Sequence, residues 1–201
     1  MTRRRAVLLA FVLVAAVACY AAVRRPPARR PPRREWPVAT KTDLAIYSAI
    51  IAGKVAERGR TCVVVSDTES GSDVTDEVSR AIGSFKKRKA DVKALMADFR
   101  KCNARSVSIP KFKAACPLVF VTRKRLDDIF RLGFWAAFYR MFPNSAGYVE
   151  FSLPGYSRDR SAAVVYFVHV WGGRAGYVEL LYLKRSDSEW RIDAEEGVLQ
   201  I

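Results

Sequence analysis

The only imidazole in the chain, His169, is the first candidate for chemistry. His169 lies in an apolar run from Val165 to Trp171, and period-2 alternation places it on the same strand face as Phe167 and Trp171. A half-buried imidazole can serve as a general base or line a ligand pocket. No neighbouring residues supply a nucleophile with an orienting acid, and no GxSxG elbow is present. We therefore expect a hydrogen-bonded structural histidine, with a general base as the alternative.

Five carboxylates lie close together between residues 67 and 77, and they suit a hard cation such as calcium by type. They are Asp67, Glu69, Asp73, Asp76 and Glu77. Their spacing does not match the EF-hand loop, whereas acids at the start of a helix are favoured by capping and by the macrodipole. A single histidine also rules out a multi-histidine metal site. We therefore expect neither a metal nor a cofactor.

The cysteines show no CxxC spacing. Cys102 is predicted to end a helix and Cys116 to precede a strand, so in an oxidising compartment the two can form a disulfide, worth about 3 kcal/mol in the chain-entropy model. The alternative is a pair of free thiols. Cys62 lies inside a β-branched run and is interpreted as a small buried hydrophobic residue, in preference to a nucleophile.

The N-terminus has the pattern of a targeting segment. Three arginines in Met1–Arg5 precede an uncharged apolar run from Ala6 to Val23, which is intermediate in length between a signal-peptide core and a spanning helix. Ala15–Cys19 resembles a lipoprotein box, in which Cys19 would become the acylated first residue. Residues 1–23 are therefore predicted to be a signal peptide or membrane anchor, with lipidation, retention as a spanning helix and simple cleavage as alternatives.

Residues 24–41 are predicted to be a linker, because Arg24–Arg34 contains only arginine, proline and one alanine. Proline favours an extended polyproline II spacer of about 3.1 Å per residue. Its arginines either contact an anionic lipid surface or remain solvated. The arginines are Arg24, Arg25, Arg29, Arg30, Arg33 and Arg34. The positive-inside rule favours a cytoplasmic domain if the anchor is retained, but the lipoprotein-like box favours export.

The net charge of +15 is unevenly distributed. Much of the excess belongs to the arginines of residues 1–40, so the following domain is only moderately basic. Its most basic run, Lys86–Lys89, is not interleaved with aromatic side chains as a nucleic-acid stacking surface would be. We expect no nucleic-acid partner. The expected partners are the membrane, through the N-terminus, and an unknown ligand or protein of the cell envelope.

Residues 42–201 are predicted to form one α+β domain, with N-terminal helices and short strands followed by a C-terminal antiparallel β-meander. Apolar spacing predicts helices over 44–55, 92–103 and 123–130, and an aromatic helix over 134–142. Short buried strands are predicted at 61–65 and 118–121, and the meander strands at 148–153, 162–171, 176–184 and 190–193. We expect the aromatic helix to cover one face of the sheet.

The stretch from Phe134 to Ile192 closely resembles a family of exported or lipid-anchored bacterial proteins that has no established activity. The resemblance rests on the aromatic helix ending in FPNS, the FSLPGY turn, the alternating strand, the Gly172–Gly173 hairpin and the strand containing Trp190. Many members place a cysteine pair at the hairpin, and this chain lacks it. The resemblance implies an envelope protein and says nothing of its mechanism.

Together these features predict a membrane-anchored or exported domain that binds a ligand or protein in the envelope and is not an enzyme. The first alternative is an envelope hydrolase that uses His169 in a cleft between the aromatic helix and the sheet. The second is an anchored adaptor facing the cytoplasm. A cleft that brings His169 together with acidic or hydroxyl side chains would favour the hydrolase. A folded domain on the cytoplasmic side of the membrane would favour the adaptor.

Overall fold

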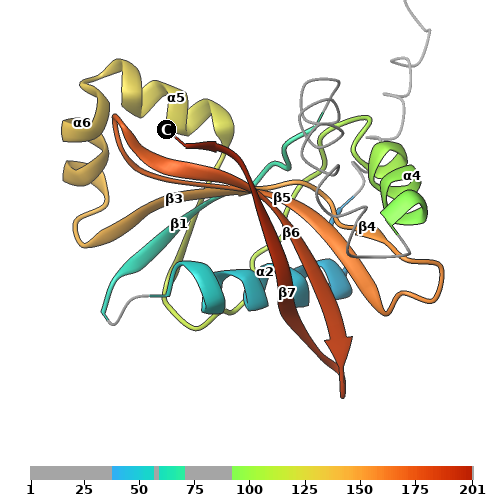
Figure 1. Ribbon diagram of the computed structural model, residues 1–201. Helices are drawn as coiled ribbons and strands as arrows, with labels where there is room; N and C mark the ends of the chain where they lie inside the picture. Colours follow the sequence, from blue (N-terminus) through green and yellow to red (C-terminus); the bar gives the residue numbers. More distant parts are fainter. Residues whose placement is uncertain (1–37, 57–58, 71–91, 201) are drawn as a thin grey trace, which may run out of the picture. The chain divides into compact units, whose positions relative to one another are not determined.

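The chain divides into two units, Met1–Glu35 and Trp36–Ile201. The computed structural model describes residues 38–56, 59–70 and 92–200, all within the second unit (Figure 1). Cys19, the linker arginines, the run Lys86–Lys89 and the acids at 73, 76 and 77 therefore lie outside the described residues. In the described ranges, no helix is both long and apolar enough to cross a membrane.

The described residues form four helices and seven strands. The helices are α2 (Lys41–Lys54), α4 (Val92–Cys102), α5 (Arg123–Arg131) and α6 (Phe134–Met141). The strands are β1 (Thr61–Val65), β2 (Leu118–Val121), β3 (Ser145–Phe151), β4 (Gly155–Tyr156), β5 (Ala162–Gly172), β6 (Ala175–Ser186) and β7 (Glu189–Gln200).

All seven strands belong to one sheet of order β2-β1-β3-β5-β6-β7, with β4 paired to β5. Strands β2, β1 and β3 are parallel, and the remaining pairings are antiparallel. The predicted α+β class and the C-terminal meander are confirmed. The two short strands, which the sequence placed without partners, extend this same sheet as its parallel half.

Helix α2 covers one face of the sheet (Figure 1). Thr40 caps it in a capping box with Asp43, which satisfies the main-chain N–H groups of these two residues. Its apolar side packs on side chains from β3, β5 and β6. Tyr47 illustrates the fit, because its ring stacks on Phe151 at 4.5 Å and its hydroxyl donates to the carbonyl of Ser152 over 3.0 Å.

The other three helices cover the opposite face. Helix α4 packs through Leu95 and Phe99 on β5 and β6, while α5 and α6 pack on Val63 and Val65 of β1. The aromatic helix α6 therefore covers one sheet face, as expected. Helix α6 lies on the face to which Tyr148 points. Val149, the next residue of β3, points to the opposite face, which α2 covers.

Glycine permits the closest approach between α4 and the sheet. A Cβ on Gly155 of β4 would lie 2.5 Å from the Phe99 Cβ and 2.7 Å from the Leu95 carbonyl oxygen. Only a residue without a side chain fits there. The contact fixes α4 over β4, next to the Asp98 carboxylate that accepts from the main-chain N–H of Tyr156 over 2.8 Å.

Candidate functional site

His169 is a buried member of β5, with 6% of its surface exposed. Its Nε2 lies 2.8 Å from the carbonyl oxygen of Ala146, which can only accept, so Nε2 carries the proton and donates. Its Nδ1 lies 3.4 Å from the hydroxyl of Tyr177, and its ring centroid lies 4.8 Å from that of Trp171. These contacts are those of a hydrogen-bonded structural histidine.

The hydrolase alternative required His169 in a cleft beneath the aromatic helix, and the fold separates the two. His169 is paired with Val149 across β3 and β5, so it shares the α2 face of the sheet. Helix α6 packs on the opposite face, beside Tyr148. His169 and α6 therefore lie on opposite faces of the sheet.

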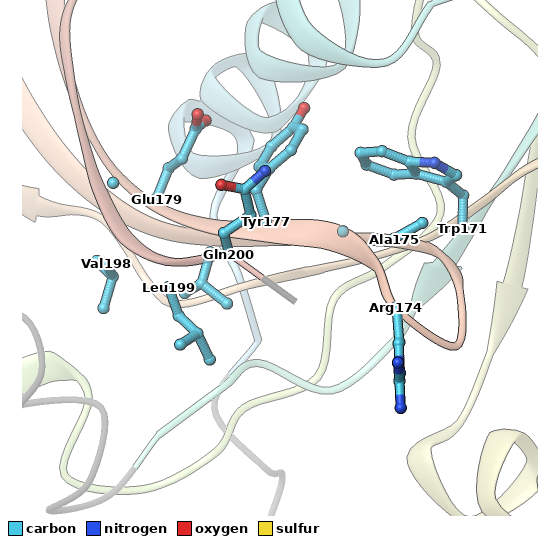
Figure 2. Close-up of a pocket in the computed structure, with 11 residues that line it drawn as sticks. Trp171, Arg174, Ala175, Tyr177, Glu179, Val198, Leu199 and Gln200 are labelled. Atoms are coloured by element: carbon cyan, nitrogen blue, oxygen red, sulfur yellow. The ribbon is translucent and has the colours of Figure 1, made fainter.

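A pocket of about 660 Å³ lies where β6 begins and β7 ends. Two of its lining residues, Trp171 and Tyr177, contact His169. Its principal side chains are Trp171, Arg174, Tyr177, Glu179, Leu199 and Gln200. Figure 2 shows that the side chains of Trp171, Tyr177 and Glu179 rise on one side of β6, whereas Arg174 and Leu199 lie on the other. The lining therefore combines aromatic and polar side chains on one side with a basic and an aliphatic side chain on the other. Trp171 is 38% exposed there.

The carboxylate of this pocket is paired with a lysine from within the fold. The Nζ of Lys54, at the end of α2, lies 2.8 Å from Glu179 and 2.8 Å from Glu195. Burial alone would lower the pKa of Lys54, but the hydrogen bonds to both glutamates outweigh burial and raise it. Lys54 also lies 5.1 Å from the Tyr177 ring centroid, and burial raises the pKa of Tyr177 to about 12. Both groups therefore keep their neutral-pH charge states.

A second cluster of charged groups lies where the parallel strands end. Arg123 follows β2 and begins α5, Glu150 lies near the end of β3, and Asp67 and Glu69 follow β1. The carboxyl ends of parallel strands are where α/β sheets bring polar side chains together. Arg123 forms a bidentate pair with Glu150, at 2.5 and 2.6 Å, and also contacts Glu69.

Burial is the main cause that raises the pKa of Glu150, whose side chain is only 6% exposed. A hydrogen bond to Glu69 raises the pKa further, since two neighbouring carboxylates resist simultaneous ionisation, and Arg123 opposes both effects. The resulting pKa is about 8. The pKa of Glu150 thus lies much closer to neutrality than that of an ordinary glutamate. The ion pair between Arg123 and Glu150 also ties α5 to β3.

The acids at 67 and 69 thus have partners within the fold. Asp67 accepts from the main-chain N–H of Arg123 over 3.3 Å, at the start of α5, and Glu69 pairs with the same arginine. Among the residues described, no three potential ligands of the histidine, cysteine and carboxylate types are grouped to hold a metal ion. Asp67 and Glu69 therefore contribute to an ion-pair cluster.

Cys102 and Cys116 are both free thiols, so the predicted disulfide does not form in this structure. Cys102 ends α4, where its Sγ lies 3.4 Å from the Phe99 carbonyl oxygen and 3.5 Å from that of Pro154. Cys116 instead packs against the core on the α2 face. Cys62 is fully buried in β1, and burial raises the pKa of its thiol, as expected of a small structural side chain.

No protein-family model, curated protein or solved structure matches this chain. The family resemblance of residues 134–192 therefore stays a prediction from the sequence.

Sequence reasoning did not identify the cluster around Arg123 or the role of Tyr177. Glu150 offered one usable signal, because it is the only charged residue of the apolar strand Ser145–Phe151 and a lone buried acid needs a partner. The partner, Arg123, lies on a different strand end 27 residues earlier. Local spacing gives no sign of that contact.

Proposed function

We propose that this chain is a membrane-anchored binding domain of the bacterial cell envelope and that it holds its ligand in the pocket at the ends of β6 and β7 without transforming it. The N-terminal segment supplies the anchor, and the folded domain supplies the recognition. The ligand is a polar molecule with an apolar face and no net charge, such as a sugar ring of an envelope glycan.

The proposal rests on one observation, which is that His169 is buried whereas Trp171 is exposed at the pocket. His169 is buried and uses its Nε2 proton on the Ala146 carbonyl, which supports a structural role. Trp171, two residues later on the same strand face, is exposed at the pocket. The imidazole therefore acts as a support for the exposed indole, and the indole is the surface that meets the ligand.

The charges and size of the pocket support an uncharged ligand. Glu179 and Glu195 share the single cation Lys54. Arg174 in the lining adds a second positive charge, so these groups together carry no net charge. Trp171 and Tyr177 offer flat apolar surfaces, and Gln200 offers both a donor and an acceptor. A volume of about 660 Å³ lies within the range of small-molecule sites, which runs from about 300 to 1,000 Å³.

The proposal is tested by isothermal calorimetry on the full chain in detergent micelles, with a soluble oligomer of N-acetylglucosamine as the probe. Wild-type protein should bind it saturably. Trp171→Ala should abolish binding, whereas Val38→Ala, which truncates an apolar side chain exposed elsewhere in the domain, should leave it unchanged. Equal binding by both variants would overturn the assignment of the pocket.

A further inference from the structure

The turn between α5 and α6 exposes two large apolar side chains. Leu132 is 78% exposed and Phe134 is 75% exposed, and only Gly133 separates them. Met141, at the end of α6, is also exposed. We call Leu132–Phe134 the apolar tip. Scattered apolar residues are normal on a protein surface, but neighbouring ones this exposed point to an interaction surface.

The backbone holds the apolar tip outward at a conformational cost. Gly133 has a φ of 154° and Phe134 a φ of 49°, and the left-handed region is strongly disfavoured for a bulky aromatic residue. The neighbouring aromatic side chains turn inward, since the Phe130 ring stacks on Phe138 at 5.9 Å and contacts Trp135 at 5.2 Å. The fold thus partly buries the rings of Phe130 and Trp135 on either side of the tip and leaves Phe134 in solvent.

The two helices that flank the apolar tip carry more basic than acidic residues. Apart from Arg123, which is paired with Glu150 and Glu69, the basic residues of α5 and α6 are Lys124, Arg125, Arg131 and Arg140, and the acids are Asp127 and Asp128. Asp128 pairs with Lys124 at 2.7 Å and with Arg131 at 3.3 Å, and both basic side chains remain largely exposed. Arg131, which directly precedes the tip, therefore presents its guanidinium to solvent.

We propose that the apolar tip inserts into the interface of an anionic phospholipid bilayer, with Arg131 and Arg140 against the headgroups. An aromatic and an aliphatic side chain beside basic residues match a membrane interface, where rings lie at headgroup depth and cations meet anionic lipid. This contact goes beyond the proposed function. It is separate both from the predicted N-terminal anchor and from the pocket at the ends of β6 and β7.

Depth-dependent quenching of a new tryptophan tests the proposal in the full chain. Phe134→Trp and the control Leu199→Trp, at an exposed site of the β6–β7 pocket, are reconstituted into vesicles that contain acyl-brominated phosphatidylcholine. The quenching of the parent protein, which has four tryptophans, is subtracted from each. Circular dichroism melting of both variants verifies that they remain folded.

The proposal predicts that Phe134→Trp is quenched several-fold more than Leu199→Trp in vesicles that also contain phosphatidylglycerol. Raising the salt concentration, omitting phosphatidylglycerol or introducing Arg131→Gln with Arg140→Gln should each reduce that quenching. Equal quenching at positions 134 and 199 would overturn the insertion. Quenching at position 134 that is independent of phosphatidylglycerol and of both arginines would overturn the role assigned to anionic lipid.

Discussion

His169 donates a hydrogen bond from Nε2 to the main-chain carbonyl of Ala146 over 2.8 Å, and so links the middle of β5 to the beginning of β3. The imidazole ring also contacts the ring of Trp171, with the two centroids 4.8 Å apart. The chain's only histidine therefore stabilises the junction that carries the exposed wall of the pocket.

Replacing His169 should cost stability, because the Ala146 carbonyl would remain buried without a donor. We expect His169→Ala to lower the free energy of unfolding by about 1–3 kcal/mol or more, since a cavity adds to the lost bond. His169→Gln, which retains a donor, should lose less. Urea unfolding measures both. A variant that keeps full stability while losing probe binding would argue that His169 contacts the ligand directly.

The cluster of Arg123, Glu150 and Glu69 should make stability depend on pH. The pKa of Glu150 is raised in the folded state to about 8 from an ordinary value of 4.5. The folded chain therefore retains a proton that the unfolded chain releases, and this contribution to stability falls as pH rises from about 4.5 to about 8.

Glu150→Gln should remove that contribution, because glutamine does not titrate. The measurement is the urea midpoint of wild type and variant across this pH range. The difference between the two midpoints at each pH reports the contribution of Glu150 alone, because the surface carboxylates are the same in both proteins. One of these is Asp159, whose pKa is lowered to about 2 by hydrogen bonds from Ser157 and Ser161. Parallel pH profiles for the two proteins would contradict the raised pKa of Glu150.

The packing of α4 on β4 predicts a strong difference between two glycines. Gly155→Ala would bring a methyl group against Phe99 and the Leu95 carbonyl, and we expect a loss of about 1–3 kcal/mol from overpacking. Gly197→Ala, in β7, meets no atom within 4 Å and should change little. Thermal melts compare the two variants. Equal losses of stability in the two variants would show that α4 shifts to accommodate the added methyl group at little cost.

The predicted anchor is tested by the intact mass of the protein extracted from membranes. A species that begins at Cys19 with added acyl mass is the result expected of a lipoprotein. An unprocessed chain would indicate a spanning anchor and reopen its orientation. A chain cleaved without acyl mass would contradict membrane anchoring through the N-terminus.

Local patterns predicted the helices well. The apolar spacing of Leu95, Met96 and Phe99 marks α4, and the aromatic spacing of 134–142 marks α6, because a helix must bury one continuous side. Strand β7 was predicted only over 190–193 but extends to Gln200. Its second half was missed because Glu195 and Glu196 interrupt the apolar pattern. In the structure β7 is an edge strand, where such side chains remain solvated, and Lys54 pairs with Glu195.

Long-range pairing explains the features that were missed. The union of β1 with β2 and β3 depends on contacts such as Cys62 with Leu118 and Val64 with Val149, which no local periodicity encodes. The same pairing brings Arg123 to Glu150. The exposed turn at Phe134 was also hidden, because its residues follow the apolar pattern of a buried helix start, and only the packed structure assigns them to solvent.

The most direct test of the central claim is to equilibrate the full chain with the N-acetylglucosamine oligomer, separate bound from free probe, and determine the mass of the recovered probe. Binding without chemistry predicts saturable retention that requires Trp171 and recovery of the probe at its original mass. A probe recovered in shorter pieces, or retained equally by Trp171→Ala, would contradict the account.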